Sequence, residues 1–251
     1  MICRTISHLW WALAGACVVC LAASGQQIPA GTVVPIQIKT GLNAEHDAAG
    51  KKIVGRVMQD VPIPGGAKIK EKALVIGRVI RVTKPGSSGA SMVVSFDTIE
   101  NDGQGIPVKA ALLAVASSME VSQAQSPVNS TSNLDSTSQW TTRQVGGDIV
   151  RRGWGKVGSS DGVEGKWING TAVAIKLTPN PKAGCPGGGP GYEGEQSVWV
   201  FSSAACGTYG LSNATVAHTG ATSPAGEIEL KSSKNLVIRS GSGWLLMLAG
   251  E

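Results

Sequence analysis

The sequence predicts an all-β protein in which a small β-barrel is followed by a second β-rich domain. Three observations lead to this prediction. Glycine is abundant, whereas phenylalanine and tyrosine occur only twice each. Valine, serine and threonine are common, and apolar residues alternate with polar ones in short segments that glycine and proline separate. Short strands joined by tight turns are the structure that such a chain favours.

The first 25 residues have the pattern of an export signal. Arg4 supplies a positive charge, and the apolar run from Leu9 to Ala23 is too short to span a bilayer comfortably. Small residues up to Gly25 suit a signal peptidase. We therefore expect residues 1–25 to be a cleaved signal peptide, with no transmembrane segment after cleavage, and the protein to reach the periplasm or the outer cell envelope. An uncleaved anchor and a lipoprotein attached through Cys17 remain alternatives.

The strands of the predicted barrel lie within residues 26–116. Val34, Ile36 and Ile38 share one face of the first strand, because successive side chains of a strand point to opposite faces. Further strands are expected at 53–58, 73–82, 92–96 and 106–115. The turn residues Asn101-Asp102-Gly103 precede the last of these. The nearly continuous apolar start of 73–82 predicts that this strand is buried on both faces.

The same region resembles the TrbI-like β-barrel domain. The resemblance rests on Ile28-Pro29-Ala30-Gly31-Thr32, on Gly50 to Val61 and on Ile69 to Val82. In that family the domain belongs to the scaffold of type IV secretion channels in the cell envelope. The resemblance covers roughly residues 28–116 and implies a barrel with a structural or assembly role. The partners that it implies are envelope proteins or further copies of the same chain. Its motif residues are glycines and apolar positions, which carry fold more than chemistry.

The second half of the chain predicts a linker and a further domain. Residues 117–164 are rich in Ser, Thr and Gly and predict a linker, because such a composition buries little apolar surface. Apolar segments return after residue 165, so 165–251 predict a β-rich C-terminal domain. Cys185 and Cys206 are the cysteines left after signal cleavage, which predicts one disulfide in an oxidising compartment. Two free thiols are the alternative.

No motif in the sequence predicts an enzyme. Residues 153–158 and 189–194 both match G-x-G-x-x-G, but neither match follows a clear buried strand. His46 and His218, the histidines of the mature chain, are too far apart to have metal-ligand spacing. Residues 26–116 carry eleven Lys and Arg against seven Asp and Glu, an excess too small to predict nucleic-acid binding. We expect no catalytic, cofactor-binding or metal-binding residue.

Tryptophans in the second half of the chain support a competing hypothesis. They are Trp140, Trp154, Trp167, Trp199 and Trp244. If Trp154, Trp167, Trp199 and Trp244 shared one surface, their indole rings would stack on sugars, as in a carbohydrate or peptidoglycan binding module. The other interpretation is that they form the core of the second domain.

Overall fold

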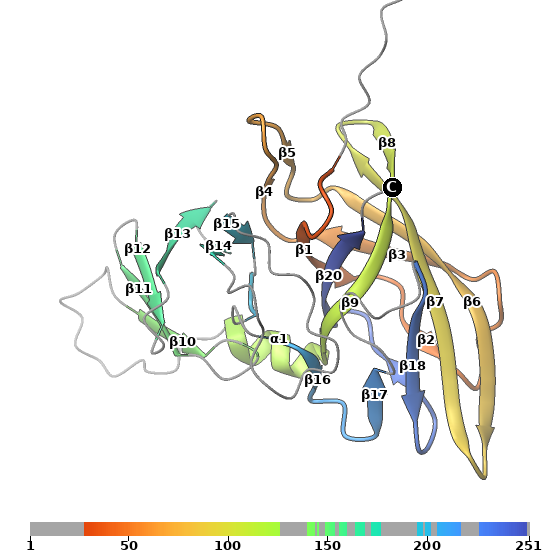
Figure 1. Cartoon of the computed structure of the whole chain (residues 1–251). Coiled ribbons are helices and arrows are strands. Elements are labelled where there is room, and N and C mark those ends of the chain that lie inside the picture. Colours follow the sequence, from red (N-terminus) through yellow and green to blue (C-terminus); the bar gives the residue numbers. More distant parts are fainter. Residues whose placement is uncertain are drawn as a thin grey trace, which may run out of the picture.

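The computed structural model describes residues 28–125 and 226–249 continuously. Between them it describes 140–143, 145, 149–153, 156–159, 164–168, 172–176, 195–197, 199–201 and 205–216. Among the described residues, strands form almost all of the regular structure and a single short helix accompanies them (Figure 1). The predicted all-β class is therefore confirmed. The predicted signal peptide, residues 1–25, lies outside the described residues.

The main sheet closes into a barrel. Its principal strands are β1 (Val33–Ile38), β3 (Lys52–Val57), β6 (Leu74–Gly86), β7 (Gly89–Asn101), β8 (Gln104–Pro107), β9 (Lys109–Ala116) and β20 (Gly243–Ala249). They pair in the order β9-β20-β1-β3-β6-β7, and β7 also pairs with β8. Between β8 and β9 the backbone N–H of Val108 donates to the carbonyl oxygen of Asp97 on β7 at 3.0 Å. Because β8 leads directly into β9, this pairing completes the ring.

Shorter elements extend the barrel. The strands β18 (Ile228–Ser232) and β17 (Ala214–Val216) continue the sheet beyond the first part of β7, and β16 (Gly207–Tyr209) pairs in parallel with β9. Two small ribbons join β2 (Leu42–Asn43) to β19 (Val237–Ile238) and β4 (Val61–Pro62) to β5 (Lys68–Ile69).

A second, antiparallel sheet is formed by six strands that lie between the two parts of the barrel in the sequence. Its strands follow chain order: β10 (Trp140–Arg143), β11 (Ile149–Gly153), β12 (Lys156–Ser159), β13 (Glu164–Ile168), β14 (Ala172–Lys176) and β15 (Glu195–Ser197). The sheet lies beside the barrel, where β15 approaches β1 and β4 (Figure 1). The helix α1 (Ser118–Gln125) precedes it. The predicted linker, residues 117–164, therefore contains a helix and several strands.

The C-terminal strands belong to the barrel, which differs from the predicted domain boundary. The strand β20 lies between β1 and β9 and pairs with both. The strand β18 pairs with β7, and β19 pairs with β2. The barrel thus combines residues 28–116 with residues 226–249, although we expected 165–251 to form a separate domain. Local alternation predicted these strands but carries no information about which distant strand each one joins.

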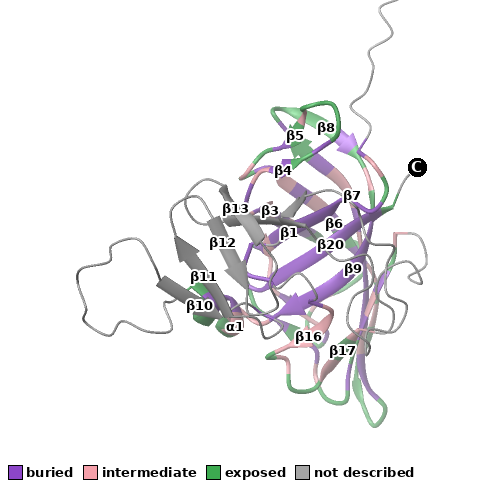
Figure 2. Ribbon diagram, turned by 60° about the vertical axis from the view of Figure 1, so that its left-hand side comes forward, coloured by how far each residue is buried: buried purple, intermediate pink, exposed green. Residues whose placement is uncertain are grey.

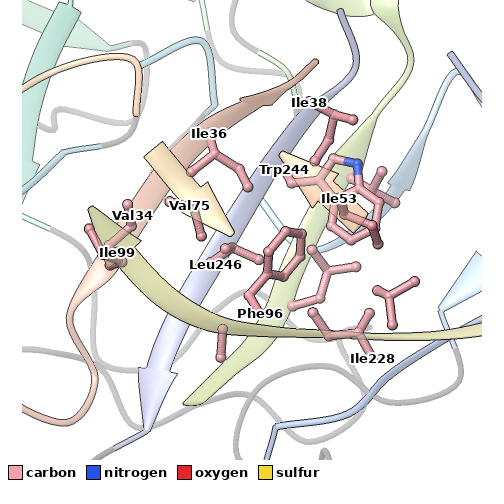
Figure 3. Close-up of a cluster of buried hydrophobic side chains, with 14 of the residues drawn as sticks. Val34, Ile36, Ile38, Ile53, Val75, Phe96, Ile99, Ile228, Trp244 and Leu246 are labelled. Atoms are coloured by element: carbon pink, nitrogen blue, oxygen red, sulfur yellow. The ribbon is translucent and has the colours of Figure 1, made fainter. Parts of the chain in front are cut away.

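The interior of the barrel is aliphatic around one aromatic pair. Figure 3 shows Val34, Ile36 and Ile38 of β1 pointing inward together with Ile53, Val75 and other buried side chains. Phe96 and Trp244 meet edge to face, with ring centroids 5.7 Å apart and an interplanar angle of 82°. Both side chains are fully buried, so this pair links β7 to the C-terminal strand at the centre of the core.

The Ile28–Thr32 motif forms the turn that leads into β1. Gly31 has a φ of 82°, a left-handed conformation that glycine adopts without steric cost. Its backbone N–H donates to the carbonyl oxygen of Leu248 at 2.7 Å. The Thr32 hydroxyl donates to the carbonyl oxygen of Pro29 at 2.7 Å. The motif therefore has a structural role, because it fixes the start of β1 against the end of β20.

A second apolar cluster covers the outside of β1, β9 and β20. Leu113, Leu245 and Met247 point away from the barrel interior and pack beneath α1, residues 199–201 and Ala205. In Figure 2 these three strands are buried along most of their length. The helix begins at an N-cap serine, because the backbone N–H of Glu120 donates to Ser117 Oγ at 3.2 Å. Strands β9 and β20 are therefore buried on both faces.

Candidate functional site

The predicted tryptophan surface is not formed as expected. Trp244 is fully buried in the barrel core, and Trp199 is 2 % exposed in the outer cluster. Trp199 packs edge to face against Phe201, and its backbone N–H donates to the Oε1 atom of the buried Gln59 at 2.9 Å. Both indoles serve packing, so neither is part of a binding surface. The side chains of Trp154 and Trp167 lie outside the described residues.

Two other sequence features have structural explanations. The first G-x-G-x-x-G match begins in the hairpin of β11 and β12, where Gly153 pairs with Lys156. A dinucleotide site would need a helix after this turn, and a strand follows instead. The second match lies outside the described residues. His46 is exposed, with its Nε2 atom 3.8 Å from Glu45 Oε2.

The predicted disulfide is only partly within the described chain. Cys206 is half-buried beside β16 and is a disulfide-bonded cysteine. Its backbone N–H donates to the Tyr209 hydroxyl at 3.0 Å. Cys185 lies outside the described residues, so the pairing of these two cysteines stays a prediction.

The outward side of β3 and β6 has the least expected feature of the barrel. The nearly continuous apolar start of 73–82 predicted burial on both faces of this strand, but the structure fully buries only one face. Val75, Gly77 and Val79 are buried, whereas Leu74 and Ile76 are only half-buried on the outer side. Val54 of β3 is also half-buried and lies directly opposite Ile76. These three aliphatic side chains belong to neither apolar cluster, so each still offers apolar area to a partner.

Cationic side chains surround these aliphatic residues. Lys52 and Arg56 lie two positions before and after Val54 on β3, and Lys39 follows the end of β1. Alternation along each strand places these groups on the outer side with Val54. Arg56 lies opposite Leu74, and Lys52 lies opposite Arg78. We call this surface the β3–β6 face. It consists of Lys39, Lys52, Val54, Arg56, Leu74, Ile76 and Arg78.

The cations of the β3–β6 face are incompletely neutralised. Arg78 Nη1 lies 3.3 Å from Asp97 Oδ2. In the described part of the chain, no carboxylate forms an ion pair with Lys39, Lys52 or Arg56. The Lys39 ammonium donates to Gln37 Oε1 at 2.8 Å, which is a neutral acceptor.

Electrostatic repulsion within the face is visible at one residue. Burial, followed by the positive charge of Arg56, lowers the pKa of the Lys39 ammonium group below its usual value. Like charges directly opposite each other on neighbouring strands also destabilise a sheet, as with Lys52 and Arg78. Elsewhere on the barrel, Asp47, Asp60 and Asp102 neutralise Lys51, Lys68 and Lys70 in turn. Three cations of the β3–β6 face, Lys39, Lys52 and Arg56, therefore carry positive charge that no ion pair within the described residues compensates.

An apolar centre with a charged rim is the arrangement of a protein interface. Burying the remaining exposed area of Val54, Leu74 and Ile76 would contribute on the order of 1 kcal/mol for each side chain. The rim charges contribute mainly to the choice and orientation of a partner. The face has the chemistry of recognition rather than of catalysis.

Sequence reasoning identified the residues of this face only as strand positions. The excess of positive charge in 26–116 was too small to predict nucleic-acid binding, and Leu74 and Ile76 were expected to be buried. The available signal was the alternation of Lys52, Val54 and Arg56 on one side of a strand. The described chain holds no group of three His, Cys, Asp or Glu side chains arranged for a metal ion. Its described part also has no helix that meets the length and hydropathy needed to cross a membrane.

Comparison with known proteins gives no family assignment. No protein-family model matches the chain. No curated protein matches it at a significant level either.

Proposed function

We propose that this protein is an exported, non-enzymatic component of the cell envelope with a structural or assembly role. The observation that carries the proposal is the β3–β6 face, where half-buried Val54, Leu74 and Ile76 have cations around them. Half-buried aliphatic residues that pack against neither core are a feature of surfaces that bind other molecules.

Two further observations support this role. The resemblance of residues 28–116 to the TrbI-like domain implies a scaffold. The apolar pattern at the start of the chain implies export. Binding through a fixed surface on a rigid barrel is the mode of action that we propose, with envelope proteins or further copies of the chain as partners.

The test is fractionation of the native host followed by crosslinking in mild detergent. We expect the protein to be recovered from the envelope fraction in a complex much larger than one chain, with mass spectrometry identifying constant partners. An unrelated exported protein of similar size is the control for nonspecific crosslinking. Recovery as a free monomer from every fraction would contradict the assembly role.

Glycan binding is the weaker alternative. Two of the four tryptophans proposed for it, Trp199 and Trp244, are buried in the two apolar clusters. The hypothesis therefore depends on Trp154 and Trp167. Titration with peptidoglycan fragments, followed by tryptophan fluorescence, tests it, and an unchanged spectrum would exclude it.

A further inference from the structure

We propose that the β3–β6 face binds an acidic polypeptide segment of a partner protein. This inference rests on the proposed assembly role and specifies the chemistry of the partner. On β3 the outward side chains alternate as cation, aliphatic and cation, in the order Lys52, Val54 and Arg56. The complement of that order is a segment with an aliphatic side chain between two carboxylates.

The spacing of the cations defines the segment further. Lys52 and Arg56 are four residues apart on one strand, which places their attachment points on the order of 13 Å apart. An extended peptide with acidic residues at positions i and i+4 has the same spacing. Its residue at i+2 would then contact Val54 and Ile76, which are directly opposite each other.

The composition of the face favours a polypeptide over other anionic partners. A nucleic acid or a sulfated polysaccharide presents a continuous row of charges and has no aliphatic side chain to pack against the centre of the face. An anionic membrane would engage a wider area than the seven residues of this face. Three aliphatic side chains between a few cations match a peptide that mixes carboxylates with aliphatic residues.

The direct test uses the full chain and a synthetic peptide of sequence SESVSESVSES, which places Glu and Val on one side when extended. Binding is measured by fluorescence anisotropy of the labelled peptide. We expect saturable binding that weakens at least about tenfold when NaCl rises from about 50 to about 500 mM, because exposed charges are screened. A peptide with Gln at each Glu position should bind much more weakly.

Charge reversal locates the binding surface. The double variant Lys52→Glu with Arg56→Glu should reduce peptide binding at least about tenfold. The matched control is Lys109→Glu with Lys234→Glu, which makes the same change in net charge at exposed positions outside the face, and it should keep most of the binding. Circular dichroism of both variants checks that the barrel is intact. Equal loss in the two variants would show a nonspecific charge effect and overturn the inference.

The outcomes separate this inference from the proposed function. If the native chain forms a large envelope complex that the Lys52→Glu and Arg56→Glu variant retains in full, the assembly role stands and the β3–β6 face is not its docking surface. If vesicles containing phosphatidylglycerol bind to the face and the peptide does not, a membrane is the partner and the inference is wrong. Loss of the complex in this variant alone, together with peptide binding, would support it.

Discussion

Removal of the C-terminal strand should unfold the whole barrel. A chain that ends at Ser242 lacks β20, which pairs with β1 on one side and β9 on the other. Five consecutive side chains of β20 are at most 6 % exposed: Trp244, Leu245, Leu246, Met247 and Leu248. At roughly 1.5 to 3 kcal/mol for each, their burial contributes about 8 to 15 kcal/mol. That contribution is as large as the total free energy of unfolding of an ordinary domain.

The assay compares the shortened chain with one that lacks only Gly250 and Glu251. We expect the control to show a folded near-ultraviolet circular dichroism spectrum, dispersed amide resonances and a cooperative urea transition. The shortened chain should lose all three, and a peptide covering residues 243–251 should restore them in part. If the shortened chain kept the control's urea midpoint, the pairing of β20 with β1 and β9 would be refuted, and residues 26–116 would be an independent barrel as first predicted.

Three further predictions concern single positions in the barrel. Lys72 has a φ of 74° and an exposed side chain, so Lys72→Gly should raise the free energy of unfolding by about 1 kcal/mol relative to Lys72→Ala. Urea titrations of the two variants measure this difference, and equal values would argue against backbone strain at residue 72. A Cβ atom at Gly77 would lie 2.1 Å from a carbonyl oxygen of β7, so Gly77→Ala should lower the free energy of unfolding by about 2 kcal/mol or more. The control Gly86→Ala, with open space around it, should be nearly neutral. Equal shifts of the melting temperature in the two variants would contradict this geometry. Arg56→Gln should raise the pKa of Lys39, because it removes a neighbouring positive charge. NMR titration of the lysine side chain measures this pKa, and an unchanged value would show that the two groups do not interact.

Local sequence patterns predicted where strands form, but they did not predict which strands pair with each other. The alternation of Val34, Ile36 and Ile38 placed β1, and Asn101-Asp102-Gly103 placed the turn between β7 and β8. The helix α1 was missed, although Ser117 caps its first turn by accepting from the backbone N–H of Glu120. Its low content of apolar residues gave no helical periodicity to detect.

The β3–β6 face was harder to predict, because the sequence does not show which strand faces are covered. An apolar residue on a strand gives the same sequence signal whether its face is covered or open. Leu113 on β9 and Ile76 on β6 are both outward-facing. Helix α1, residues 199–201 and Ala205 cover the region of Leu113, whereas neither apolar cluster includes Ile76. What covers a face depends on the three-dimensional path of distant segments. The β3–β6 face could therefore be recognised only in the folded chain.

The ring of strands also determines when the protein can fold. Gln37 of β1 contacts the carbonyl oxygen of Gly241, just before β20, across a sequence separation of 204 residues. Until residues 243–249 are available, β1 and β9 each have an edge that lacks its partner β20, and unpaired edges are sites of aggregation. Contacts this distant in sequence also slow folding, because a long loop must close first. During synthesis the early strands must therefore wait until β20 has been made, and a chaperone that shields strand edges would have its greatest effect in that interval.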